Sequence, residues 1–217
     1  LLICRHPLGD TVTESPLLYG LRKAYPNYWI TLVCSKENFN LLECCPYADE
    51  VIPYSSKTNK SFLKENLKRT YQFAEEYFAC RKYELALIPS SCMPALIEAW
   101  LVHFSGAERR VTYSEKFNTI MHKEYMGAYD AYFTDSLFDD QLKHEVERNL
   151  DLLKVLGLNA ENESLELWTN ESDQERVRSL FREEDISEEI LRVIVNLSTS
   201  AKSKDWPVEN YIEVCAK

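Results

Sequence analysis

Glycine is scarce in this chain of 217 residues, which contains only five. No G-x-G-x-x-G fingerprint and no G-x-x-x-x-G-K-[ST] loop is present, which excludes the usual dinucleotide site and a P-loop kinase or ATPase. A G-x-S-x-G elbow and an H-E-x-x-H motif are missing too. The four histidines are scattered without metal-ligand spacing, so we predict no metal site.

Long apolar runs are also absent, and no segment approaches the roughly 18 residues that a membrane span needs. No signal peptide is evident. Basic residues number 25 against 35 acidic ones, which gives a net charge of −10. This balance argues against nucleic acid as a partner and gives no independent support for contact with anionic lipid.

The seven cysteines form no C-x-x-C pair, and their number is odd. The pattern therefore supports neither a zinc site nor a disulfide framework. Most of the cysteines lie in apolar segments, which is typical of buried free thiols in a reducing compartment. We therefore expect a cytoplasmic protein.

The chain does have the composition of an ordinary globular protein, 45% hydrophobic and 28% charged. Apolar runs typical of strands alternate with segments of helical periodicity. This alternation predicts an α/β fold, a doubly wound parallel sheet with helices on both faces. Strands are expected at residues 1–4, 29–34, 50–53, 84–88 and 110–111, and helices at 13–25, 36–44, 60–80, 94–104 and 140–156.

The later part of the chain is less regular. Residues 114–139 are rich in aromatic side chains without a clear period, which predicts a short helix and an irregular crossing segment. Beyond them, we expect a strand at 165–168, a helix at 172–182, a buried strand at 191–197 and a helix that begins near Pro207.

These elements suggest three parts. We predict an N-terminal doubly wound domain at 1–158, a linker and domain-crossing segment at 159–190, and the first strand–helix unit of a second domain at 191–217. Residue 1 already lies in a predicted strand and residue 217 in a predicted helix. We therefore expect the chain to be part of a longer protein.

The segment Leu8-Gly9-Asp10 follows the first apolar run and precedes a helical pattern. Asp10 is therefore expected at the carboxyl end of a strand, the edge where open α/β sheets bind ligands. A carboxylate held there can take a proton from a bound hydroxyl. The alternative is that Asp10 merely caps the following helix.

Three segments stand out together: Leu8–Val12, His144–Leu150 and Lys204–Pro207. Their order and spacing resemble glycosyltransferase family 9, the heptosyltransferase family of lipopolysaccharide core assembly, and so do residues 83–88 and 106–111. The resemblance covers nearly the whole chain. It implies a GT-B architecture, in which two Rossmann-like domains face each other across a cleft. This chain would then hold the acceptor-side domain and the start of the donor-side domain.

The resemblance also implies roles for individual residues. Asp10 matches the aspartate regarded as the general base that activates the acceptor hydroxyl. Lys204 matches the lysine that precedes Trp-Pro and contacts the phosphates of the donor. Thr199 and Ser200 match the hydroxyl-bearing loop beside that lysine, near the diphosphate.

Four further residues are candidates for the acceptor or the cleft. His144 and Arg148 match the His-x-x-x-Arg helix of the family, and their role is either packing at the cleft or contact with the acceptor. Arg109 and Arg110 could bind an anionic acceptor or, as the alternative, pair locally within the fold.

The function implied by the resemblance is a metal-independent, inverting transfer of an ADP-heptose-like sugar. The acceptor would be a lipopolysaccharide-core or other envelope glycan, and no cofactor is needed beyond the nucleotide-sugar substrate. The resemblance allows peripheral association with the inner membrane, and we expect an isolated fragment to be inactive. The alternative is a non-catalytic module, derived from such a transferase, that binds a glycan or a partner protein.

Two features depart from the family pattern. The stretch Arg5–Leu8 is one residue shorter than in many members. Glu14 and Ser15 also stand where small or apolar residues are common. Both departures flank the segment that carries Asp10.

Overall fold

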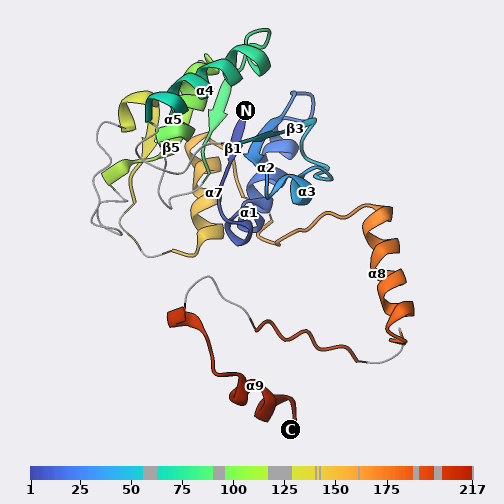
Figure 1. Ribbon diagram of the computed structural model, residues 1–217. Helices are drawn as coiled ribbons and strands as arrows, with labels where there is room; N and C mark the ends of the chain where they lie inside the picture. Colours follow the sequence, from blue (N-terminus) through green and yellow to red (C-terminus); the bar gives the residue numbers. More distant parts are fainter. Residues whose placement is uncertain are drawn as a thin grey trace. The chain divides into compact units, whose positions relative to one another are not determined.

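The computed structural model describes residues 1–55, 63–89, 96–116, 129–139, 141, 143–160, 162–187, 191–197 and 202–216. The chain divides into two compact units, Leu1–Asn170 and Glu171–Lys217 (Figure 1).

The first unit is built around a six-stranded sheet in the order β3-β2-β1-β4-β5-β6, and all neighbouring strands run parallel. The strands are β1 (Leu2–Cys4), β2 (Thr31–Ser35), β3 (Glu50–Tyr54), β4 (Leu85–Leu87), β5 (Arg109–Tyr113) and β6 (Asp135–Leu137). The direction of winding reverses between β1 and β4, so their carboxyl ends flank the crevice where such sheets bind ligands. The predicted doubly wound parallel sheet is confirmed.

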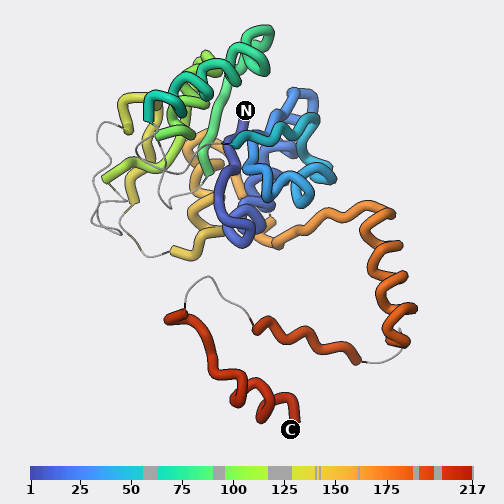
Figure 2. Tube along the Cα trace, in the orientation of Figure 1, coloured from blue at the N-terminus to red at the C-terminus, as the bar shows by residue number. Residues whose placement is uncertain are grey.

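Helices cover both faces of this sheet because successive strand residues point to opposite sides. In β1, Leu2 and Cys4 belong to a core shared with α2, α3 and α7, whereas Ile3 belongs to a core shared with α4 and α5. Figure 2 traces the chain through these elements in the orientation of Figure 1. The helices that the structure describes in this unit are α1 (Leu8–Thr13), α2 (Ser15–Ala24), α3 (Phe39–Leu42), α4 (Leu63–Tyr77), α5 (Leu96–Phe104), the 3₁₀ helix η2 (Tyr129–Tyr132) and α7 (Glu145–Val155).

The helix predicted at residues 13–25 begins earlier and consists of two helices, α1 and α2. Pro7 starts α1 because its fixed φ of −51° suits the residue before a first helical turn. Pro16 stands in the first turn of α2, where a missing N–H costs nothing. The Leu-Gly-Asp segment is therefore helical instead of a strand-end turn.

Two strand predictions in the first unit are wrong. Residues 135–137 form β6, although the prediction for the aromatic region 114–139 contains no strand. Residues 117–128 of that region lie outside the described residues. Residues 165–168 form no strand. Their backbone is held by side chains instead of a ladder, since the Glu166 N–H donates to Ser15 Oγ at 2.9 Å. The Tyr47 hydroxyl also holds this segment, because it donates a hydrogen bond to the Glu166 carboxylate.

The second unit contains α8 (Glu171–Glu183), the 3₁₀ helix η3 (Lys202–Lys204) and α9 (Val208–Cys215). Both predicted helices are thus confirmed. The strand predicted at 191–197 is wrong, because this extended segment belongs to no ladder and Leu191 and Ile194 are 92% and 95% exposed. A strand needs a partner for its N–H and C=O groups, and the described part of this unit contains none. The division at 158 and 190 and the second domain stay predictions.

Gly20 lies where α2 packs against α7. A Cβ added at this position would lie 2.5 Å from Leu153 Cδ1. We expect Gly20→Val to destabilise the fold by about 1–3 kcal/mol, because the helices or Leu153 must shift. Gly9→Val is the matched control, since an added Cβ there meets no heavy atom within 4 Å. Urea unfolding measures both free energies, and equal values for the two variants would contradict the prediction.

Candidate functional site

The candidate site begins at the carboxyl end of β1. The strand ends at Cys4, and the chain passes through Arg5, His6 and Pro7 into α1. Pro7 occupies the N-cap position of this helix. The Leu-Gly-Asp segment thus forms the first turn of a short helix at the β1–β4 switch point of the sheet.

Asp10 is the third residue of α1, and its side chain is partly exposed. The N-cap position belongs to Pro7 and no side chain caps the helix, so the alternative that Asp10 is an N-cap is wrong. Among the residues described, none donates a hydrogen bond to its carboxylate. The first turn places this carboxylate near the positive end of the helix dipole. The role of Asp10 as a base stays a prediction.

Two buried pairs of charged side chains, which sequence reasoning missed, flank this turn. His6 Nδ1 lies 2.5 Å from Glu14 Oε1, and the two side chains are only 7% and 1% exposed. Arg5 pairs with Glu98, which stands in the first turn of α5, the helix that follows β4. The second pair therefore bridges the switch point from β1 to β4.

The surroundings of His6 favour its protonated form. Burial alone would lower the pKa of the imidazole, but the carboxylates of Glu14, Glu98 and Asp10 together raise this pKa above its usual value. Burial also raises the pKa of Glu98, against the opposing effect of Arg5. The charged form of His6 is thus favoured by three neighbouring acidic side chains.

Neighbouring elements fasten α1 at both ends. At the start of α3, Asn38 Nδ2 donates to the His6 carbonyl at 2.7 Å and to Thr11 Oγ1 at 2.8 Å. From α7, Asn149 Nδ2 donates to the Thr13 carbonyl at 3.0 Å. A six-residue helix is not stable in isolation, so these tertiary contacts decide where Asp10 stands.

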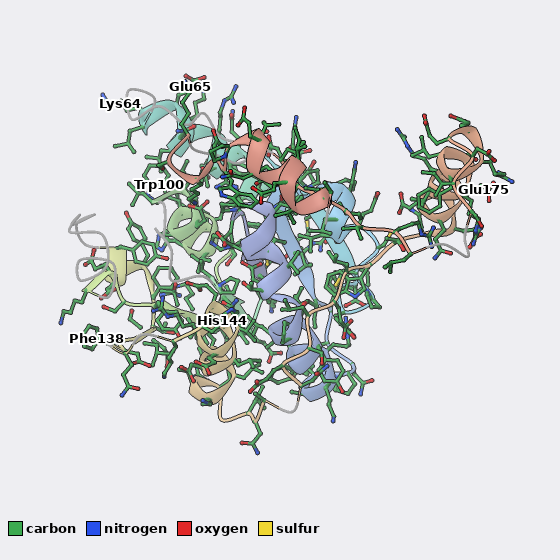
Figure 3. The ribbon with its side chains drawn as sticks, turned by 90° about the horizontal axis from the view of Figure 1, so that it is seen from below. Lys64, Glu65, Trp100, Phe138, His144 and Glu175 are labelled. Carbon is green, nitrogen blue, oxygen red and sulfur yellow. The ribbon has the colours of Figure 1, made fainter. Side chains whose placement is uncertain are left out.

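His144 and Arg148 lie on α7, the helix that touches α1. His144 is its N-cap, labelled in Figure 3, and Nδ1 accepts a bond from the Val146 N–H at 3.3 Å. Glu147 completes a capping box, which explains why the helix begins at 145 and not at 140. Arg148 is buried and bonds to Glu145 at 3.4 Å. Both residues thus have structural partners, and acceptor contact stays a prediction.

Arg109 and Arg110 open β5, at the edge of the sheet opposite to Asp10. Through β4, Val111 lies level with Leu2, so the two arginines stand on the amino side of the strands. The structure therefore does not bring them together with Asp10.

Local partners hold both arginines. Arg109 Nη2 lies 3.1 Å from Asp135 Oδ1 and donates to the Val155 carbonyl at 2.9 Å. Arg110 donates to two backbone carbonyls at 2.7 Å each. These contacts agree with the alternative of local pairing.

A cavity of about 300 Å³ opens at that amino edge. Its lining includes Leu1, Trp29 and Tyr83, which precede β1, β2 and β4, as well as Arg109. Because each of these residues stands before its strand or at its first residue, the cavity lies away from the carboxyl edge that carries Asp10.

The predicted donor residues belong to the second unit. Thr199 and Ser200 lie outside the described residues. Lys204 ends η3 and is exposed, and the following Trp206 packs edge-on against Tyr211 with ring centroids 4.8 Å apart. Contact with a diphosphate stays a prediction.

Within the described ranges, no group of His, Cys, Asp and Glu side chains could hold a metal ion. None of the helices described has the length and apolar character needed to cross a membrane.

The strand order and the helices on both faces define a Rossmann-like α/β fold. The glycosyl transferase family 9 protein from Veillonella parvula DSM 2008 aligns with a TM-score of 0.81 at 19% identity, over 99% of this chain and 57% of that chain. The E. coli ADP-heptose LPS heptosyltransferase II aligns with a TM-score of 0.65 at 17% identity, over 99% and 59%. The E. coli heptosyltransferase WaaC with ADP aligns with a TM-score of 0.63 at 16% identity, over 99% and 61%.

At such identities the likeness concerns the fold, and the predicted resemblance to glycosyltransferase family 9 is confirmed at that level. The chain has the fold of part of a GT-B-like glycosyltransferase, and it spans about three fifths of the length of these structures. No protein-family model matches it, and no curated protein sequence does so significantly.

Proposed function

We propose that this chain is the acceptor-side part of a glycosyltransferase. The transferase moves a heptose-like sugar from a nucleotide-diphosphate donor to a lipopolysaccharide-core or other envelope glycan. The observation that carries the proposal is Asp10, a carboxylate with no hydrogen bond from the described residues, at the β1–β4 switch point of a fold similar to known glycosyltransferases. In sheets of this kind, the carboxyl edge is where ligands bind.

In this proposal Asp10 is the general base. Its carboxylate takes the proton of the acceptor hydroxyl while that oxygen attacks the anomeric carbon of the donor sugar. The bond from the anomeric carbon to the diphosphate breaks through an oxocarbenium-like transition state. Base assistance of this kind is worth roughly 10²–10⁴-fold in rate.

The leaving diphosphate needs charge stabilisation on the donor side. We assign this role to Lys204 together with the hydroxyls of Thr199 and Ser200, which precede it in the sequence. A lysine and hydroxyl donors can stabilise the diphosphate without a metal ion. One solved neighbour is described as WaaC with ADP-2-deoxy-2-fluoro heptose, which supports an ADP-heptose-like donor as the first substrate to test.

The proposal places the protein in the cytoplasm, with peripheral association at the inner membrane through its acceptor. Cys4, Cys34 and Cys45 support a reducing compartment, because all three are free and buried.

The test is release of nucleoside diphosphate by the full-length protein, supplied with ADP-heptose and a lipopolysaccharide-core acceptor. We expect release only when both substrates are present, and no loss of rate when a chelator is added. Binding of the glycan without release, across several donors and acceptors, would overturn the proposal and favour the non-catalytic module.

A further inference from the structure

The short helix that carries Asp10 is bracketed by two side chains that bond to each other. His6 stands between β1 and α1, and Glu14 follows Thr13 at the end of α1. The contact of His6 Nδ1 with Glu14 Oε1 therefore joins the two ends of a backbone segment that contains the whole of α1. Because a carboxylate only accepts, the imidazole Nδ1 is the donor.

We propose that His6 and Glu14 form a positioning pair that holds α1, and with it Asp10, in the orientation needed for proton transfer. The inference rests on the proposed function, because it concerns the same site and the same step. Neither side chain needs to touch the substrate for this role.

Burial shows why the effect of the pair is mainly geometric. Both side chains are almost entirely removed from solvent, and the Glu14 carboxylate also interacts with the buried Cys4 thiol. Compared with apolar side chains of similar size, a buried charged pair adds little to stability, because desolvation offsets its attraction. The hydrogen bond between His6 and Glu14 is directional, however, so it favours one arrangement of the two side chains. The backbone between them, which includes α1, is thereby held in one conformation.

The other bonds to α1 do not replace this one. Asn38 holds the His6 carbonyl and Thr11, and Asn149 holds the Thr13 carbonyl. Each of these bonds fixes one end of the helix against a neighbouring helix. The His6–Glu14 pair joins the two flanks of α1 directly to each other.

The pair should depend on pH. His6 is faced by Glu14 beyond α1, by Asp10 of α1 and by Glu98 of α5, and these carboxylates raise its pKa above the usual value. A raised pKa means that the charged pair is fully present below about 6.5 and weakens as the pH rises through the folded-state value. The charged groups of the site also include Arg5, which is paired with Glu98.

The first experiment compares His6→Gln and Glu14→Gln with wild type in the full-length protein. We expect kcat to fall about 10- to 100-fold with little change in the KM of the donor, because a misplaced base slows the chemical step. The double variant should lose no more than either single variant. Wild-type kcat should decline on the alkaline side as His6 loses its proton, and both variants should lack that decline.

Glu50→Gln is the matched control. It breaks the Arg81–Glu50 ion pair at the first residue of β3, on the amino edge of the sheet, whereas α1 follows the carboxyl end of β1. We expect wild-type kcat and an unchanged pH profile. Unfolding midpoints of all the variants separate a loss of positioning from a loss of fold.

A measurement on the wild-type protein needs no variant. The Thr11 N–H donates to the Pro7 carbonyl at 3.0 Å and reports on α1. Its hydrogen-exchange protection factor should fall severalfold as the pH rises through the titration of His6, which NMR follows directly. The His6 pKa should return toward its usual value in Glu14→Gln.

The outcomes separate the inference from the function on which it rests. An inactive wild type would contradict the proposed function, while the exchange measurement would still test the pair. An active wild type that depends on Asp10, together with unchanged kcat and pH profile in both variants, would overturn the inference. A protection factor of the Thr11 amide that does not change as His6 titrates would overturn the inference as well.

Discussion

Replacing Asp10 with asparagine is expected to lower acceptor-dependent release of nucleoside diphosphate at least about 100-fold in the full-length protein. The amide keeps the shape of the carboxylate but cannot take the proton of the acceptor hydroxyl. Donor binding should remain, since the assigned phosphate contacts lie elsewhere in the chain.

The fold should survive this change. Asp10 is partly exposed, and its carboxylate accepts no hydrogen bond from the part of the chain that the structure describes. The expected loss of stability is about 0.3–1 kcal/mol, which is the value of a negative charge in a first helical turn. Thermal or urea unfolding of the purified variant measures it.

Asp173→Asn is the matched control, because Asp173 is the third residue of α8 as Asp10 is of α1. Both variants remove one charge from a first turn, and only Asp10→Asn should affect turnover. Equal turnover in Asp10→Asn and wild type would keep the transferase and remove Asp10 from the role of base. A stability loss well above the control would mean that Asp10 is mainly structural.

The second large effect is expected for Lys204→Ala, which should weaken binding of ADP to the full-length protein. Loss of one hydrogen bond to a charged group costs about 1.5–3 kcal/mol, or roughly 10- to 100-fold in Kd. Lys204 is exposed at the end of η3, so the fold should remain intact. Isothermal titration calorimetry with ADP gives the Kd directly.

Lys202→Ala provides the control, since Lys202 is an exposed lysine in the same 3₁₀ helix. It removes the same charge from the same segment and should change the Kd far less. If both variants bind ADP equally, general electrostatic attraction explains any loss. If neither differs from wild type, the assignment of Lys204 to the diphosphate is wrong.

Much of the fold could be predicted because the pattern of apolar residues is local. The runs at β2, β3 and β4 and the periodicity of α4 and α5 each lie within a short window of sequence. The strand predictions are wrong where a strand depends on pairing with a segment far away in the sequence. β6 has weak apolar character and exists through pairing with β5, whereas residues 191–197 are apolar and find no such partner among the described residues.

The candidate site divides in the same way. The sequence points to Asp10 because Leu-Gly-Asp comes shortly after the first strand and before a helical pattern. The sequence marks Glu14 only as a departure from the family pattern, because spacing alone does not indicate that His6 is its partner. The sequence leaves Arg109 as a candidate for contact with an acceptor. In the structure its guanidinium is bonded to Asp135, which lies 26 residues away in sequence.

The sequence by itself determined the α/β alternation, the parallel sheet and the place of Asp10 after the first strand, because these depend on neighbouring residues. Only the tertiary structure decided which buried charges meet at the switch point. Arg5 and Glu98 are 93 residues apart in sequence, and β1 and β4 bring them together. Such pairs form because the folded core removes both charges from water, so each must find a partner that no local pattern specifies.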